Sequence, residues 1–354
     1  MTDILFTGGG TAGHVIPIIP LIEKLSAKGI EMAFIGTASG FESDLLRSYP
    51  VEYYSIPSGK LRRYFSLRNI IDAFRVLLGI FRSYVLLGRI RPRVVFSKGG
   101  FVSFPVVFAA RLRRIPILLH ESDVTPGLAN KLSMPFADKL YLNFPDASSG
   151  NFSGDTITTG TPIRKDLLFG DPIKGRQVLG VPENQPLLLV TGGSLGADLL
   201  NQTIRSSLPD LLDKFWVVHI CGHGKVCERA NERYMQFEYI DKDWGDVLAA
   251  ADLVVSRAGA NIVYELLVLG KPNLLIPLSR KASRGDQIEN ANYAKKKGYS
   301  SVIYEEDLDP ENLVSRIEET WTRLAEFKGY LSHFKAPDSV SIICEELYSY
   351  LQKN

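Results

Sequence analysis

The stretch from residue 253 to residue 277 constrains the fold more than any other part of the chain. An apolar segment, Leu253–Val255, runs through a small-residue turn, 256–259, into a helical pattern, and a second apolar segment, Leu274–Ile276, closes the unit. This order predicts a βαβ unit with parallel strands. Ligands of open parallel sheets lie beyond the carboxyl ends of the strands, where helix N-termini offer unpaired N–H groups. We therefore expect the turn at 256–259 to face a ligand.

Glu265 is predicted to lie about one helical turn inside this helix. A carboxylate at that place can accept two hydrogen bonds from vicinal hydroxyls, such as the 2′ and 3′ hydroxyls of a ribose. It can also serve only to complement the positive end of the helix dipole. This stretch alone leaves both interpretations open.

The strand and turn pattern occurs in both halves of the chain. Ile4–Thr7 leads into the Gly-rich turn Gly8–His14, and Leu187–Thr191 leads into Gly192–Ala197. A chain of 354 residues is also too long for one usual core. We expect two α/β domains, residues 1–163 and 164–338, with a final helix at 339–354 that can pack back on the first domain.

The first Gly-rich turn matches G-x-G-x-x-G, but a dinucleotide site is not predicted. That site needs an acid at the end of the second strand, and the apolar run Ala33–Ile35 is followed by Gly36 and Thr37. His14 is a candidate general base because an imidazole with a pKa near 6.5 can take a proton from a hydroxyl. The alternative is that His14 only caps the helix or lines the loop.

Three loops of the first half follow strand ends and are expected to converge. They cover residues 8–14, 98–103 and 120–127, and the last carries the sequence His120-Glu121-Ser122-Asp123. In the second half, Phe215–Ile220 and Phe237–Ile240 are predicted as further strands.

A basic block covers residues 47–114, with fourteen Lys and Arg against two acids, so the remaining chain carries a net negative charge. Within it, a helix is predicted from about 66 to 90, with Phe74, Leu77 and Phe81 on one apolar stripe. Arginines recur every seven residues on another face, and Val76, Ile80 and Leu87 widen the apolar arc. An anionic membrane surface attracts such a helix. A core helix with a solvated basic face is the alternative.

Other global features narrow the class of protein. Three cysteines without metal-ligand spacing are typical of a reduced intracellular protein. No apolar run reaches the roughly 20 residues that cross a bilayer, so a soluble or peripheral protein is expected. The basic block lacks exposed stacking aromatics, which argues against nucleic acid as a partner.

Five blocks in order carry a resemblance over essentially the whole chain: Gly8–His14, Lys98–Pro105, His120–Lys131, Gly192–Asn201 and Ser256–Glu265. With them the chain resembles the MurG family of glycosyltransferases. This family adds N-acetylglucosamine (GlcNAc) from UDP-GlcNAc to undecaprenyl-pyrophosphoryl-N-acetylmuramoyl-pentapeptide, the step from lipid I to lipid II in peptidoglycan synthesis. The resemblance implies a GT-B fold, in which two Rossmann-like domains face a cleft. It also implies an acceptor site in the first domain, a donor site in the second and inverting transfer without a metal or other cofactor.

The resemblance assigns roles to individual residues. His14 would be the base, with Glu121 as a rival or orienting partner, and Gly99, Gly100 and Phe101 would form an acceptor or phosphate loop. The donor contacts would be Thr11, Ala12, Gly13, Asp123, Arg164, Ser194, Ile240, Ala260, Asn261, Ile262, Val263, Tyr264, Glu265 and Gln287. The helical pattern described above, and not the resemblance, gives the membrane-associating residues Arg68, Arg75, Ile80, Arg82 and Leu87. Implied partners are UDP-GlcNAc, lipid I, an anionic membrane on its cytoplasmic face and other cell-wall synthesis proteins.

Two positions depart from the family pattern. The common turn GGTGGH has Ala12 in place of its middle glycine, and the common HEQN is here HESD. Asp123 thus replaces an amide that can donate, and an ionised carboxylate can only accept. The departures leave room for a related enzyme with another lipid acceptor, such as diacylglycerol. A UDP-GlcNAc epimerase and a catalytically silent cell-wall scaffold are further alternatives.

Overall fold

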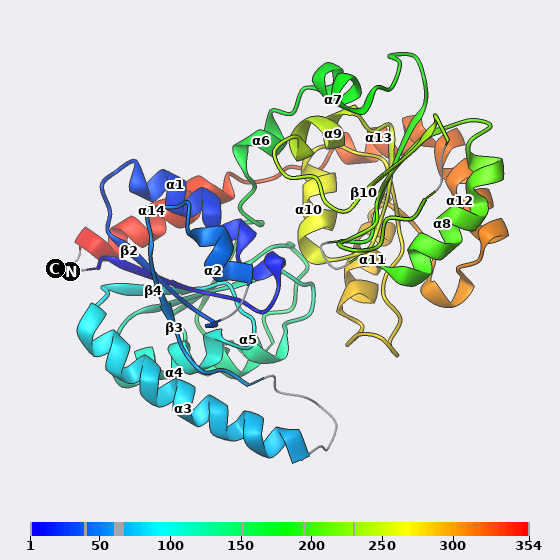
Figure 1. The fold of residues 1–354 in the computed structure, drawn as a ribbon. Coiled ribbons are helices and arrows are strands. Elements are labelled where there is room, and N and C mark those ends of the chain that lie inside the picture. The colour runs from blue at the N-terminus through cyan, green and yellow to red at the C-terminus, as the bar shows by residue number, and fades with distance from the viewer. Residues whose placement is uncertain are drawn as a thin grey trace. The chain divides into compact units, whose positions relative to one another are not determined.

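The structure of the protein is a computed structural model that describes residues 2–38, 41–59, 67–150, 152–193, 196–228 and 231–352, and only the backbone of residues 41 and 67–70. The chain divides into two compact units, residues 1–163 with 337–354 and residues 164–336. Each unit contains one parallel sheet with helices around it (Figure 1). The expected two-domain α/β fold is therefore confirmed.

The first unit has a seven-stranded parallel sheet with the order β3-β2-β1-β4-β5-β6-β7. Its strands are β1 (Ile4–Thr7), β2 (Met32–Gly36), β3 (Glu52–Ser55), β4 (Val94–Ser97), β5 (Ile117–Glu121), β6 (Lys139–Leu142) and β7 (Asp155–Thr158). The order reverses between β1 and β4, which is the position where doubly wound sheets bind ligands.

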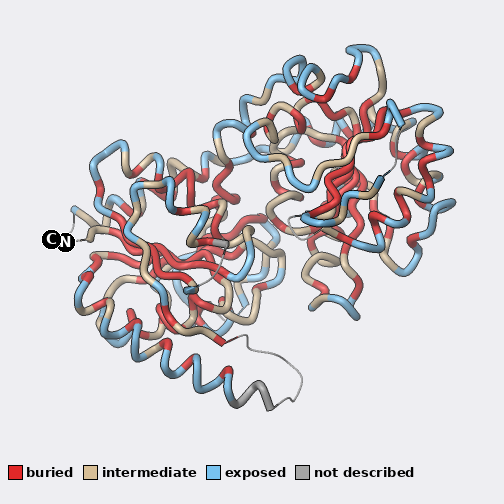
Figure 2. Tube along the Cα trace, viewed as in Figure 1, coloured by how far each residue is buried: buried red, intermediate tan, exposed pale blue. Residues whose placement is uncertain are grey.

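Helices cover both faces of this sheet. They are α1 (Ile19–Ser26), α2 (Phe41–Leu46), α3 (Leu67–Ile90), α4 (Ser103–Leu112), α5 (Leu128–Ser133) and α14 (Ser339–Gln352), with 3-10 turns η1 (Ala12–His14), η2 (Ile16–Ile18) and η3 (Met134–Phe136). Because strand side chains alternate between faces, Phe6 packs in a core with α1 and α14, whereas Leu5 packs in a core with α3 and α4. Figure 2 shows the strands as the buried centre of the unit.

Helix α3 packs on the rest of the unit through a stripe that includes small residues, and its phenylalanines lie outside this stripe. Val76, Gly79, Ser83 and Leu87 are buried. A Cβ added at Gly79 would meet the carbonyl oxygen of Pro57 at 2.4 Å, so the backbone approaches closely there. Such a close approach leaves Phe74, Leu77 and Phe81 on the outer face. In the described part of the chain, no helix is long and apolar enough to span a membrane.

The second unit has a six-stranded parallel sheet with the order β10-β9-β8-β11-β12-β13. Its strands are β8 (Leu187–Thr191), β9 (Trp216–Ile220), β10 (Tyr234–Phe237), β11 (Leu253–Ser256), β12 (Asn273–Leu275) and β13 (Ser301–Val302). Its helices are α6 (Lys165–Leu168), α7 (Pro172–Leu179), α8 (Asp198–Leu211), α9 (Trp244–Ala250), α10 (Ala260–Val268), α11 (Asp286–Lys296), α12 (Pro310–Thr322) and α13 (Leu324–Ser332), with the 3-10 turn η4 (Glu305–Asp307).

The structure corrects one predicted strand. Residues 237–240 were expected to form it, but β10 is Tyr234–Phe237, and its Tyr234 pairs with Val217 of β9. The buried Tyr234 ring lies against His219. Because Tyr234 supplies the inward contact, the strand begins earlier, and Ile240 lies in the loop that follows it.

Candidate active site

In the first unit, the three predicted loops follow the adjacent strands β1, β4 and β5. The backbone N–H of Lys98 donates to the carbonyl of Thr7 at 2.9 Å, which continues the β1–β4 pairing into the loops. Because the carboxyl ends of neighbouring parallel strands meet at one edge of a sheet, the loops lie side by side.

The first two of these loops are packed backbone to backbone. Gly10, Gly99 and Gly100 have φ values of 87°, 91° and 89°, a region that favours glycine. A Cβ on Gly100 would meet the carbonyl oxygen of Gly9 at 2.1 Å, and one on Gly10 would meet the Phe101 ring at 2.3 Å. Ala12 starts the turn η1, and it is not among the two described non-glycine residues with positive φ. Its methyl group therefore carries no left-handed strain.

We expect Gly100→Ala to lower the free energy of unfolding by roughly 1–3 kcal/mol, because a left-handed alanine costs energy and the Cβ would strike backbone. Gly29→Ala is a matched control, since Gly29 has φ +71° and nothing within 4 Å of its added Cβ. Urea denaturation of both variants measures the difference. An equal loss of stability in both would mean that the close packing of the two loops is not tight in solution.

His14 lies at the end of η1 and is partly exposed. Its Nδ1 lies 2.9 Å from Oγ1 of Thr11. When Nδ1 carries the hydrogen and donates to this hydroxyl, the lone pair is on Nε2, which can then accept a proton. The contact with Thr11 thus fits a general base whose reactive atom is Nε2.

Glu121 holds the third loop together. One carboxylate oxygen accepts the N–H of Asp123 at 2.9 Å, and the other accepts the N–H of Gly127 and the side-chain amide of Asn130, both at 2.9 Å. The side chain is only 3% exposed. A carboxylate with three donors in a buried place is suited to shaping the loop and to orienting its neighbours, and these bonds argue against a role as the base.

Lys98 is buried beneath the same loops, with 1% of its surface exposed. Its Nζ lies 2.9 Å from Nδ1 of His120 and also donates to Oγ of Ser122. Burial lowers the pKa of Lys98 to about 7, although attraction to Glu121 and Asp123 opposes the shift. The sequence patterns assigned no role to Lys98. A lysine directly before a Gly-Gly turn at a strand end is the signal that marks it.

In the second unit, Glu265 lies on α10, which begins directly after β11 and the turn ending at Gly259. The half-buried side chain lies among neighbours that displace most of its water. This burial raises the pKa of Glu265 to about 7, and the attraction of Arg164 partly opposes the rise. Ligand hydroxyls that donate hydrogen bonds to this carboxylate would replace the lost water contacts and stabilise its charged form.

Arg164 is close enough to Glu265 to influence its charge, and it also lies 3.6 Å from Asp166 and 3.9 Å from Asp241. Its Nε is buried and has no hydrogen-bond partner among the described residues. A guanidinium with a spare donor suits a phosphate oxygen. Tyr239, which the sequence patterns did not single out, also interacts electrostatically with Arg164 and Glu265.

Other predicted donor-binding residues of this unit lie on α10 and α11. Ala260, Asn261, Ile262, Val263 and Tyr264 form the first turns of α10, with Ala260, Val263 and Tyr264 buried. Oε1 of Gln287, near the start of α11, accepts the N–H of Leu278 at 3.1 Å, so this amide is held beside the loop after β12. Ser194 lies outside the described residues. Among the residues that are described, no cluster of His, Cys, Asp and Glu has a metal-binding arrangement.

The predicted membrane-associating residues differ in exposure. Arg75 and Arg82 are exposed, whereas Ile80 is half-buried. Leu87 is 1% exposed and packs in the core between α3 and α4, so its assignment to the outer face is wrong. The side chain of Arg68 lies outside the described part. The outer face of α3 instead exposes other apolar residues, namely Ile71, Phe74, Leu77, Leu78, Phe81, Tyr84 and Val85.

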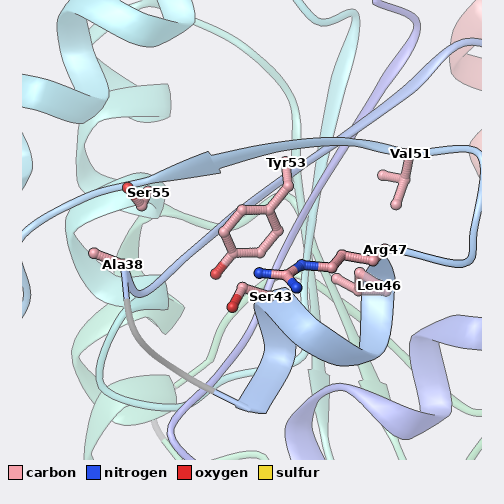
Figure 3. Close-up of a pocket in the computed structure, with 7 residues that line it drawn as sticks. All are labelled: Ala38, Ser43, Leu46, Arg47, Val51, Tyr53 and Ser55. Carbon is pink, nitrogen blue, oxygen red and sulfur yellow. The ribbon is translucent and has the colours of Figure 1, made fainter.

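A separate pocket of about 430 Å³ lies between α2 and β3 in the first unit (Figure 3). Its lining residues are Ala38, Ser43, Leu46, Arg47, Val51, Tyr53 and Ser55. The Tyr53 hydroxyl donates to the carbonyl of Thr37 at 2.6 Å. None of the residues predicted for catalysis or binding lines this pocket.

Two family models match the chain in the order of its two units. The glycosyltransferase family 28 N-terminal domain matches residues 4–142, and the corresponding C-terminal domain matches residues 187–326. The chain belongs to glycosyltransferase family 28. The two matched regions include β1 and β8, the strands that precede the Gly-rich turns.

Relatives of known name cover nearly the whole chain. A protein of Clostridium kluyveri is 49% identical over 90% of this chain and 91% of its own length; its name is UDP-N-acetylglucosamine--N-acetylmuramyl-(pentapeptide) pyrophosphoryl-undecaprenol N-acetylglucosamine transferase. A Bacillus cereus protein with the same name and the suffix 2 is 44% identical over 98% of this chain and 99% of its own.

Solved structures share the fold at lower identity. MurG from Acinetobacter baumannii superposes with a TM-score of 0.77 at 23% identity, covering 99% of this chain and 100% of that one. The UDP-GlcNAc 2-epimerase from Neisseria meningitidis gives a TM-score of 0.65 at 15% identity, with full coverage of both chains. Such a fold serves both transfer and epimerisation, so the fold alone does not choose between them.

Proposed function

We propose that the protein transfers GlcNAc from UDP-GlcNAc to the C4 hydroxyl of N-acetylmuramic acid in undecaprenyl-diphospho-N-acetylmuramoyl-pentapeptide, which converts lipid I to lipid II. The observation that carries this proposal is the 44–49% identity to family 28 relatives whose names state this activity, over 90–98% of the chain. Family 28 membership makes the protein a glycosyltransferase.

The second unit supplies the donor site in this proposal. Glu265 accepts hydrogen bonds from the ribose hydroxyls, and Arg164 offers its guanidinium to the diphosphate. The burial that raises the pKa of Glu265 and the spare buried donor of Arg164 support these assignments. Gln287 and the start of α10 complete the site beside the same strand ends.

The first unit supplies the base and the acceptor loops. Nε2 of His14 removes the proton of the attacking hydroxyl, while Thr11 holds the other ring nitrogen. As the bond to the sugar breaks, negative charge builds up on UDP, and Arg164 with nearby helix N-termini stabilises it. Transfer by this route inverts the configuration at the sugar carbon and needs no metal.

Incubation with UDP-GlcNAc and different acceptors tests this function against its rivals. We expect a disaccharide product with a lipid I analogue and none with diacylglycerol. A paralogue for another lipid would show the opposite preference, whereas an epimerase would change UDP-GlcNAc without any acceptor. A scaffold would leave UDP-GlcNAc unaltered.

The outer face of α3 is the proposed membrane-binding surface. Phe74, Leu77 and Phe81 are each exposed by 65–69%. Arg75 and Arg82 are exposed beside them. Apolar side chains flanked by arginines bind an anionic bilayer surface through both burial and charge. We place the protein peripherally at the cytoplasmic face of the cell membrane, where its lipid-linked acceptor is held.

We expect the triple variant Phe74→Ser, Leu77→Ser, Phe81→Ser to bind anionic vesicles at least about tenfold more weakly, because each buried apolar side chain contributes about 1.5–3 kcal/mol. Sedimentation with phosphatidylglycerol vesicles measures binding. Phe169→Ser is a matched control, since Phe169 is an 80% exposed aromatic in the second unit. Equal binding by both variants and the unaltered protein would rule out α3 as the membrane contact.

A further inference from the structure

Lys98 is a buried cation that the reaction described above does not use. It is among the largest fully buried side chains of the first unit, directly below the turn Gly99–Phe101. Burying an ammonium group costs several kcal/mol unless polar groups and opposite charges surround it. A methionine would fill similar space without that cost. We therefore expect the ammonium group of Lys98 to interact with specific polar or charged groups that offset the cost of its burial.

The contacts of Lys98 define its charge state. Nε2 of His120 lies 2.8 Å from the carbonyl of Gly160, so Nε2 carries the ring hydrogen and donates it. Nδ1 of His120 then accepts from the Lys98 ammonium at 2.9 Å. Burial and the charge of Lys98 hold the pKa of His120 well below its usual range. His120 is thus neutral, and the positive charge of this cluster is on Lys98.

The two negative groups around Lys98 lie at the carboxyl end of β5, Glu121 as its last residue and Asp123 in the loop that follows. Glu121 and Asp123 are the two carboxylates whose attraction raises its pKa. Glu121 already accepts three N–H donors, from Asp123 and Gly127 of the loop and from Asn130 on α5. Asp123 is partly exposed, and it is the residue that replaces the amide of the common family sequence. Ser122, between the two acids, accepts a hydrogen bond from the ammonium itself.

We propose that Lys98 is a positioning residue of the transfer reaction: its buried ammonium holds Ser122 and balances the charge of Asp123, so that the loop after β5 presents a carboxylate to sugar hydroxyls. This role rests on the function proposed above. Asp123 then accepts hydrogen bonds where an amide would offer both a donor and an acceptor. Lysine at 98 and aspartate at 123 act as one unit that selects hydroxyl donors on the substrate.

A double-mutant cycle of Lys98→Met and Asp123→Asn tests the coupling, with kcat and KM measured for a lipid I analogue and for UDP-GlcNAc. We expect Lys98→Met to lower kcat/KM about tenfold or more in the wild-type background, and about twofold or less beside Asp123→Asn, since coupled pairs show such non-additivity. Equal losses in both backgrounds would overturn the proposal. If Lys98→Met alone does not fold, Lys98→Gln replaces it in the same cycle.

The pH profile separates this role from a purely structural one. Because a buried lysine with a pKa near 7 loses its charge above that pH, kcat/KM of the wild type for the lipid I analogue, measured at saturating UDP-GlcNAc, should fall as pH rises through that range. The groups that bear on this titration are His120, Glu121 and Asp123. Lys98→Met should lack the fall, and an identical alkaline limb in that variant would contradict the role. A wild-type protein without transferase activity would overturn the proposed function and this role together, whereas an active wild type with an unaffected Lys98→Met overturns this role alone.

Discussion

His14→Ala is expected to lower kcat for transfer roughly 10²- to 10⁴-fold, the range that a positioned general base contributes. The affinity for UDP-GlcNAc should stay within about twofold, because the imidazole acts on the acceptor hydroxyl. The structure supports the assignment through the 2.9 Å contact between Nδ1 of His14 and Oγ1 of Thr11: when Nδ1 donates to this hydroxyl, Nε2 carries the lone pair.

Single-turnover transfer and calorimetric binding of UDP-GlcNAc measure the two quantities separately. His333→Ala is the matched control, since His333 is exposed at the end of α13 and should be replaceable without effect. Unchanged turnover in His14→Ala would remove His14 as the base. A parallel loss of donor binding and turnover would make it a binding residue instead.

Glu265→Ala is expected to weaken UDP-GlcNAc binding about 10- to 100-fold or more, because each hydrogen bond to a charged group contributes about 1.5–3 kcal/mol. The comparison of UDP with 2′-deoxy-UDP sharpens this test. Wild type should bind the deoxy compound more weakly than UDP, whereas Glu265→Ala should bind both equally. Glu318→Ala, a change at an exposed position of α12, is the control.

The raised pKa of Glu265 gives this prediction a pH signature. Below about pH 7 the half-buried carboxyl binds a proton, and above it the ionised form accepts hydrogen bonds from both hydroxyls. Donor affinity of the wild type should therefore increase as pH rises through about 7, and Glu265→Gln should lack this increase. A persisting preference for UDP over its deoxy form in Glu265→Ala would place the ribose elsewhere.

The sequence predicted those features that depend on local pattern. Apolar runs that end in Gly-rich turns identified β1, β8 and β11, and parallel pairing then brought the loops after β1, β4 and β5 to one edge. The turn before Glu265 was found in the same way. These patterns are local because the residues that end a strand, form the turn and start the next helix are all within a short stretch of sequence.

Features set by tertiary packing were not predicted. Strand β10 begins at Tyr234 because of the contact of its ring with His219, which is distant in sequence. On α3, periodicity marks Phe74 and Phe81 as the apolar stripe, but Gly79 and Ser83 are buried because the backbone approaches its neighbours closely. Lys98 is similar, since its burial arises from the assembly of separate loops. Because lysines are mostly exposed in folded proteins, the residue type did not indicate that Lys98 is buried.

The central claim is that the protein transfers GlcNAc by an inverting, metal-independent attack of a lipid-linked hydroxyl. The most direct measurement is NMR of the disaccharide formed from UDP-GlcNAc and a lipid I analogue in the presence of EDTA. We predict a single β-linked GlcNAc on the C4 hydroxyl of N-acetylmuramic acid, formed at the same rate with and without the chelator. An α-linked product, or a product that forms only after a divalent metal is restored, would contradict the account.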